Sequence, residues 1–330
     1  MFERSKIILL VTVAAIFVAS RFSSHIDPYY YDIILSIGIN IILAVSLNLV
    51  NGYTGQFSLG HAGFMSVGAY AAAMFTTYAS GPFLGILGPL GPFLSVTIFF
   101  GIALFLGGLA AGVTGLLVGI PSLRLKGDYL AIVTLGFGEI IRVIIENVDA
   151  LGGSRGLSVA SGYTNLFWVF ATAALTIYVI VNLVNSTYGR GFLTVRDDEI
   201  AAEAMGINTT KYKVLAFTLA AFFAGIAGGL YAHDKQFINP EGFNFLKSVD
   251  IVTMVILGGM GNTTGVTIAA VLLTILPEWL RHLSERPWLP HWIAPLLANR
   301  TIPYSLLLII LMLTRPQGLF GAPGLKRKKA

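Results

Sequence analysis

Long apolar runs recur from one end of the chain to the other, and they limit its possible folds more than any other feature. Ten such runs are recognisable, at residues 7–19, 33–50, 64–79, 93–119, 129–147, 163–184, 213–232, 249–260, 263–280 and 302–314. Only 11% of the residues are charged, against about 25% in soluble domains, and several runs approach the ~20 residues that cross a bilayer as a helix. The sequence therefore predicts an all-α polytopic membrane protein with about ten transmembrane segments, forming a single domain over residues 1–330.

Some of these runs are too short to be ordinary spanning helices. Residues 249–260 would extend only about 18 Å as a helix, well below the roughly 30 Å of the hydrocarbon core, and residues 302–314 are also short. We therefore expect discontinuous helices among the segments. Residues 7–19 have a length that suits either a signal peptide or a membrane helix, and the poor cleavage site at residues 18–20 favours a retained helix.

A glycine-rich, polar break at residues 51–64 separates two apolar runs, and a second one at residues 258–265 separates two later runs. Irregular backbone at membrane depth is tolerated only where protein buries it or where it lines a watery cavity. Two such breaks at corresponding places in two related halves indicate a central pathway, and a plain connecting loop is the alternative. The residues predicted to line the pathway are Asn48, Asn51, Gly55, Gln56, Ser58, Gly60, His61, Gly258, Gly259 and Gly261.

Three asparagines, Asn40, Asn48 and Asn51, are spaced to share one face of a helix. Polar side chains in lipid need partners, so this face is expected to point into the helix bundle. Either hydrogen bonds between helices or a role in the pathway would explain it. A metal site at His61 is disfavoured because neither a carboxylate nor a second histidine lies nearby in the sequence.

Three charged residues, Glu139, Arg142 and Glu146, interrupt the fifth apolar run at helical spacing. Residues three and four apart on a helix are neighbours, so the two carboxylates can both pair with the guanidinium. A charge near the middle of a membrane costs at least ~2.5 kcal/mol on insertion scales, and pairing reduces that cost. A structural ion pair is the favoured interpretation, and a proton or substrate relay is the alternative.

The polar segment at residues 196–207 predicts a short helix of two to three turns. Asp197, Asp198 and Glu199 suit a helix N-terminus, the alanine-rich sequence that follows favours a helix, and Gly206 suits the stop. Either this helix only connects two spans on the membrane surface or it is a docking site for a cytoplasmic partner.

The distribution of basic residues predicts the orientation of the chain. With an inner N-terminus and alternating spans, 13 of the 21 lysines and arginines lie inside and 8 outside, which is the bias expected of a membrane protein. The basic tail at residues 321–330 then lies in the cytoplasm with the N-terminus. Because the basic residues are scattered and form no stripe, nucleic-acid binding is not expected.

The motifs of common catalytic sites are absent from the sequence. There is no G-x-x-x-x-G-K-[ST], no H-E-x-x-H and no G-x-S-x-G. The chain is therefore predicted to be no enzyme, with no ATPase site and no cofactor of its own.

Several stretches together resemble the permease subunits of branched-chain amino acid (LIV-type) ABC importers, and the M-type subunit in particular. The matching stretches are residues 47–62, 127–135, 137–142, 152–156, 196–206, 256–261 and 314–320. The resemblance covers nearly the full length, and the Gly127 to Leu130 and Glu139 to Arg142 stretches indicate the M type.

This resemblance implies the partners and the function of the chain. It implies a homologous second permease, two ATPase subunits that bind ATP and Mg, and an extracytoplasmic binding protein, in a bacterial or archaeal inner membrane. The implied substrates are Leu, Ile and Val, although urea and short-amide importers are similar. An ion-coupled secondary transporter using Glu139, Arg142 and Asp250 is the other alternative. The implied contacts with the ATPase are Arg196, Asp197, Glu199, Ala202, Glu203, Ala204 and Gly206.

Overall fold

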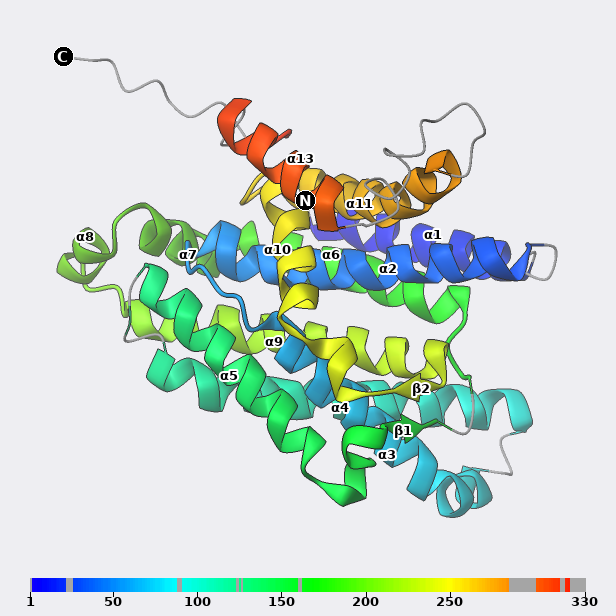
Figure 1. Ribbon diagram of the computed structural model, residues 1–330. Helices are drawn as coiled ribbons and strands as arrows, with labels where there is room; N and C mark the ends of the chain where they lie inside the picture. The colour runs from blue at the N-terminus through cyan, green and yellow to red at the C-terminus, as the bar shows by residue number, and fades with distance from the viewer. Residues whose placement is uncertain are drawn as a thin grey trace.

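The computed structural model describes residues 2–21, 26–87, 91–122, 125, 127–159, 162–284, 301–314 and 318–320. The basic tail predicted at residues 321–330 lies outside the described residues. The described chain is almost entirely helical (Figure 1). Its α-helices are α1 (Phe2–Arg21), α2 (Pro28–Asn48), α3 (His61–Leu87), α4 (Pro92–Ser122), α5 (Asp128–Glu146), α6 (Leu166–Val184), α7 (Thr187–Asp197), α8 (Glu199–Ala204), α9 (Thr209–Lys235), α10 (Phe245–Gly258), α11 (Thr263–Ser284) and α13 (Thr301–Thr314).

Short elements join these helices. They are the π-helix η2 (Leu49–Tyr53), the 3₁₀-helices η4 (Asp149–Leu151), η5 (Gly153–Arg155) and η6 (Pro240–Phe243), and the strands β1 (Leu157–Ser158) and β2 (Phe237–Ile238). The two strands pair antiparallel, with Leu157 opposite Ile238. They lie at the end of the molecule opposite α8 (Figure 1), because the 27-residue α9 separates the two ends by about 40 Å.

Five helical segments in the described residues are long and apolar enough to cross a membrane. They are Pro28–Tyr53, Phe93–Ser122, Leu166–Val184, Thr209–Lys235 and Thr263–Leu283. These segments confirm the predicted class, an all-α membrane protein, whereas the number of ten spans and the two related halves stay predictions. The helix α10 has only 14 residues, in line with the short span predicted there.

Helices α3, α4 and α9 pack against one another through small residues. A Cβ added to Gly68 would lie 2.1 Å from the Cα of Gly225, and one added to Gly115 would lie 2.4 Å from the Cβ of Ala221. Small residues let membrane helices approach this closely. Glycine and alanine on α3, α4 and α9 therefore form the faces through which these helices pack.

Helix α2 runs through the middle of the molecule. It packs against α6, α9, α10 and α11, and every residue from Gly38 to Asn48 is buried. A helix that is apolar all round is expected to be buried on all sides. Figure 1 shows α2 crossing the bundle, with its last turn toward α7 and α8. This position brings the first glycine-rich break into the interior.

Candidate functional site

The two glycine-rich breaks meet in direct contact at the α8 end of the molecule. After α2, the chain widens into the π-helix η2, and the side-chain oxygen of Asn48 accepts the backbone N–H of Gly261 at 2.9 Å. A Cβ added to Gly52 would lie only 2.2 Å from the Gly261 nitrogen. Irregular helical turns of this kind often mark functional sites. The two breaks, which the sequence places at corresponding positions in the two halves, are therefore in contact. We call this contact between residues 48–52 and Gly261 the junction.

Residues 54–60 form no helix or strand, and side chains of the preceding segment hold them in place. Asn51 accepts the backbone N–H of Ser58 at 3.1 Å, and its amide reaches the carbonyl of the same residue at 3.5 Å. Ser46 of α2 and the ring of His61, at the start of α3, form a hydrogen bond of 2.9 Å. Further along, the N–H of Leu59 donates to the hydroxyl of Thr134 at 3.0 Å.

Most polar residues of the first break are thus buried and bonded within the protein. The buried members are Asn48, Asn51, Gln56, Ser58 and His61. In the observed conformation, these buried residues are packed within the protein and are not open to water. Burial in protein is one of the two environments in which a membrane tolerates irregular backbone. The pathway role of these residues stays a prediction. The asparagines point into the bundle as expected, since Asn40, Asn48 and Asn51 are all buried. Asn40 bonds Thr274 on α11, and Asn48 bonds Gly261 in the turn before α11.

The second break is a tight turn between α10 and α11. Gly259 has φ +92° and Gly261 has φ +82°, backbone conformations that favour glycine because it has no Cβ. Gly258 packs so closely that an added Cβ would lie 2.4 Å from the Cα of Val266. Asn262 accepts the N–H of Gly265 at 3.1 Å and so caps α11. This turn forms one wall of a cleft of about 500 Å³, which Tyr53 and Arg196 also line.

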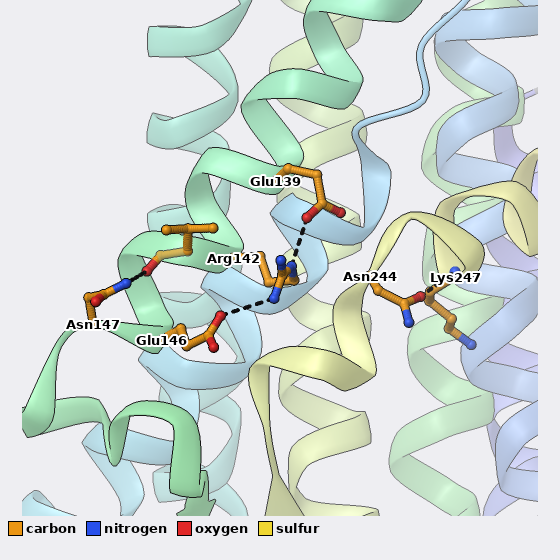
Figure 2. A network of polar contacts seen from close by, with 7 residues as sticks. Glu139, Arg142, Glu146, Asn147, Asn244 and Lys247 are labelled. Carbon is orange, nitrogen blue, oxygen red and sulfur yellow. Dashed lines mark hydrogen bonds and ion pairs between the residues drawn. The ribbon is translucent and has the colours of Figure 1, made fainter.

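Glu139, Arg142 and Glu146 form the ion-pair cluster that their spacing predicts. Nε of Arg142 donates to Glu139 at 2.7 Å, and its Nη1 donates to Glu146 at 3.0 Å. Figure 2 shows the three side chains pointing toward one another along α5, with Asn244 and Lys247 of the neighbouring α10 segment nearby and Lys247 directed away from Arg142. The cluster is 24–36% exposed, so it lies at the edge of the chain and not in its core.

The predicted helix at residues 196–207 exists but is shorter than expected. Only six residues form α8, because Asp198 is its N-cap and accepts the backbone N–H groups of Ile200 and Ala201 at 3.0 Å. Arg196 and Asp197, which were predicted to belong to this helix, instead end α7. The predicted stop is confirmed, since Gly206 has φ +80°.

Two side-chain contacts fix α8 to the first turns of α9. The ammonium of Lys213 pairs with Glu199 at 2.7 Å, and the hydroxyl of Thr209 donates to Glu203 at 2.7 Å. Lys213 is only 2% exposed, so this pair is largely removed from water. The sequence does not reveal this burial, because an isolated lysine beside an acidic segment is ordinarily solvated.

Apart from Glu203, the exposed residues of α8 are apolar. Ile200 is 74% exposed and Met205, which follows the helix, is 81% exposed. Arg196, at the end of α7, lies against both breaks. Its Cγ would be 2.9 Å from a Cβ added to Gly55, and its Nη1 would be 3.3 Å from a Cβ added to Gly261. The short helix, its anchoring helix α9 and the junction of the two breaks therefore form one connected region.

Comparison with known proteins places this architecture in a family. The model of the family described as "Branched-chain amino acid transport system / permease component" matches residues 29–314. The chain belongs to this family. Its description is that of a transport component and not of an enzyme. The chain is accordingly a multi-pass membrane permease, and its M-type resemblance is supported by the relatives described next.

Several relatives are branched-chain amino acid transport permease proteins. The LivM permease proteins of Salmonella typhimurium and Escherichia coli are each 35% identical over 249 and 247 residues, or 65% and 64% of this chain. The aligned part is about half of each relative, 56% and 55% of its length. The probable LivM permease of Methanocaldococcus jannaschii is 28% identical over 74% of both chains. No solved structure matches the chain significantly.

Proposed function

We propose that this chain is the permease subunit of an ATP-driven importer of branched-chain amino acids. The family and the names of the relatives support both the transport class and the substrate. Two separate ATPase subunits bind ATP and Mg, a homologous second permease completes the pathway, and an extracytoplasmic binding protein delivers the substrate. The chain lies in the inner membrane of a bacterium or archaeon, with both termini and α8 on the cytoplasmic side.

The main support for a contact with the ATPase subunits is the structure of α8. A six-residue helix that exposes Ile200 and Met205 to water would gain from an apolar cleft in a partner. Its own fold does not need those two side chains, because Asp198 caps it and Glu199 anchors it. A short, pre-organised helix with an apolar exposed side suits docking, since little conformational entropy is lost on binding.

The same construction provides a route for movement from the ATPase to the membrane. A displacement of α8 is transmitted to α9 through the Glu199–Lys213 pair. It is also transmitted through the end of α7, where Arg196 lies against both glycine-rich breaks. We propose that closure of the ATPase pair moves α8 and thereby rearranges the junction, with Gly55, Gly60 and Gly261 allowing the backbone to repack along the pathway.

Copurification with the ATPase subunits tests the docking role of α8. The chain would be expressed with its genomic neighbours, and the double variant Ile200→Ser with Met205→Ser would be compared with Phe237→Ser. Phe237 is a matched control because it is also exposed but lies in β2 at the opposite end. We expect the double variant to retain at least tenfold less ATPase than the wild type, and the control to retain the same amount as the wild type. Full retention by the double variant would show that α8 is not the docking element.

A further inference from the structure

A second cleft lies away from the junction, between α2, α9, α10 and α11, and encloses about 210 Å³. Figure 1 shows α10 crossing α2, and both α10 and α11 contact α2. The cleft is unusual for a membrane protein because charged groups of both signs line it. Its charged and amide-bearing lining residues are Asp32, Asn40, Lys247, Asp250 and Glu278.

The cleft reaches far into the bundle. Asn40 lies about 18 Å along the 21-residue α2 from its first residue, Pro28, so it is beyond the midpoint of that helix. The ammonium of Lys247 donates to the side-chain oxygen of Asn40 at 3.4 Å. The side-chain amide of Asn40 donates to the hydroxyl of Thr274 on α11 at 2.9 Å. Lys247 therefore brings a positive charge to the depth of Asn40, well away from the helix ends.

Lys247 and Asp250 are spaced to present a cation and an anion side by side. They are three residues apart on α10, so their side chains lie on the same face of that helix, and both line the cleft. Ionisable residues within membrane segments are costly and usually functional. The 3.4 Å contact of Lys247 with Asn40 is longer than the usual 2.7–3.2 Å of such bonds.

The rest of the lining is mixed. Ile39 of α2, Met254 of α10 and Leu273 of α11 form an apolar part, and Ser36, Tyr231 and Thr274 add hydroxyl groups. A cavity of about 150 Å³ holds benzene, which has six heavy atoms. A cleft of 210 Å³ therefore has room for a ligand of about eight heavy atoms, the size of a small aliphatic amino acid. An apolar part beside several polar and charged groups suits a small ligand that carries both kinds of group.

We propose that this cleft binds the transported amino acid within the permease. The carboxylate of the zwitterion contacts Lys247, its ammonium contacts Asp250, and its aliphatic side chain packs on Ile39, Met254 and Leu273. The identity of the ligand rests on the proposed function, whereas the recognition of a zwitterion with an apolar side chain rests on the cleft. The permease itself then contributes to selectivity, in addition to the binding protein.

Direct binding of radiolabelled leucine to the assembled permease complex in nanodiscs, without the binding protein, tests this assignment. We expect saturable binding to the wild type that isoleucine and valine displace. 4-Methylpentanoate, which is leucine without the ammonium, and isopentylamine, which is leucine without the carboxylate, should not displace it. Lys247→Met and Asp250→Asn should each weaken binding at least tenfold. Binding of leucine by either variant with the affinity of the wild type would overturn the assignment. Displacement of leucine by either truncated analogue would overturn it as well.

Two further variants separate a lost site from a lost fold. Lys247→Arg keeps the charge and should bind leucine within a few fold of the wild type. Lys211→Met removes a charge from the exposed start of α9, far from the cleft, and should leave binding unchanged. ATP-driven leucine uptake by the same complexes, reconstituted in sealed proteoliposomes with the binding protein outside, distinguishes the two proposals. Uptake with no saturable leucine binding in the nanodiscs refutes the cleft alone, whereas binding without ATP-driven uptake refutes the importer and leaves the cleft standing.

Discussion

The ion pair between Glu199 and Lys213 predicts an asymmetric response to mutation. Lys213 is 2% exposed and Glu199 is 21% exposed. Removing one partner should therefore cost a different amount of free energy depending on which charge is left behind. Glu199→Gln leaves an ammonium buried beside a neutral amide. Breaking a buried pair in this way costs about 3–5 kcal/mol. Lys213→Met leaves a carboxylate that still reaches water, so its cost should be nearer the ~1 kcal/mol of exposed pairs.

Hydrogen exchange of the α8 amides measures this difference directly. The N–H groups of Ala202 and Met205 are bonded within the short helix, so they exchange only when α8 opens. A loss of about 3–5 kcal/mol corresponds to a rise in opening of more than about 100-fold, because each 1.4 kcal/mol is a factor of ten. We therefore expect Glu199→Gln to bring these amides close to unprotected rates. Lys213→Met should accelerate them about tenfold or less.

The double variant, Glu199→Gln with Lys213→Met, supplies the internal control. It removes both charges, and replacing a whole buried pair is often close to neutral. Its amides should therefore exchange more slowly than those of Glu199→Gln alone. Equal exchange in both single variants, or no change in either, would show that this pair does not anchor α8 and would remove one step of the coupling route.

Three further substitutions test the junction, the end of α8 and the charge cluster. Gly52→Ala places a Cβ 2.2 Å from the Gly261 nitrogen and should cost about 1–3 kcal/mol in thermal unfolding of the purified complex, whereas Gly85→Ala, which meets nothing within 4 Å, should be neutral. Gly206→Ala has open space but φ +80°, so a cost of about 1–2 kcal/mol in the same assay is expected, and an unchanged unfolding temperature would argue against this conformation. Arg142→Met leaves two carboxylates without their partner on an apolar helix and should lower thermal stability by about 2.5 kcal/mol; loss of uptake with unchanged thermal stability would favour the relay interpretation over the structural ion pair.

The parts of the fold that follow from local chemistry could be predicted from the sequence. The apolar runs predicted the membrane class, the spacing of Glu139, Arg142 and Glu146 predicted their pairing, and the glycine at 206 predicted the end of a helix. Each of these depends on residues within a few positions of one another. The length of α8 was predicted less well because Asp198 and Asp197 are both good capping residues, and only the backbone decides which of them serves.

Long-range contacts could not be read in the same way. Nothing near Asn48 in the sequence indicates that it accepts a hydrogen bond from Gly261, 213 positions later. The burial of Lys213 depends on how α8 folds back on α9. The second cleft needs α2, α10 and α11 together, although Asp250 was already named for the ion-coupled alternative. Tertiary packing, and not local propensity, determines these features.

ATP-driven uptake into proteoliposomes tests the central claim most directly. The chain would be reconstituted with the second permease and the ATPase subunits encoded beside it, with ATP and Mg enclosed and the binding protein and radiolabelled leucine outside. We expect leucine to accumulate inside the vesicles, and disabling the catalytic residues of the ATPase subunits should abolish this accumulation. Uptake that persists with the disabled ATPase, or that an imposed ion gradient drives in its place, would contradict the assignment as an ATP-driven importer.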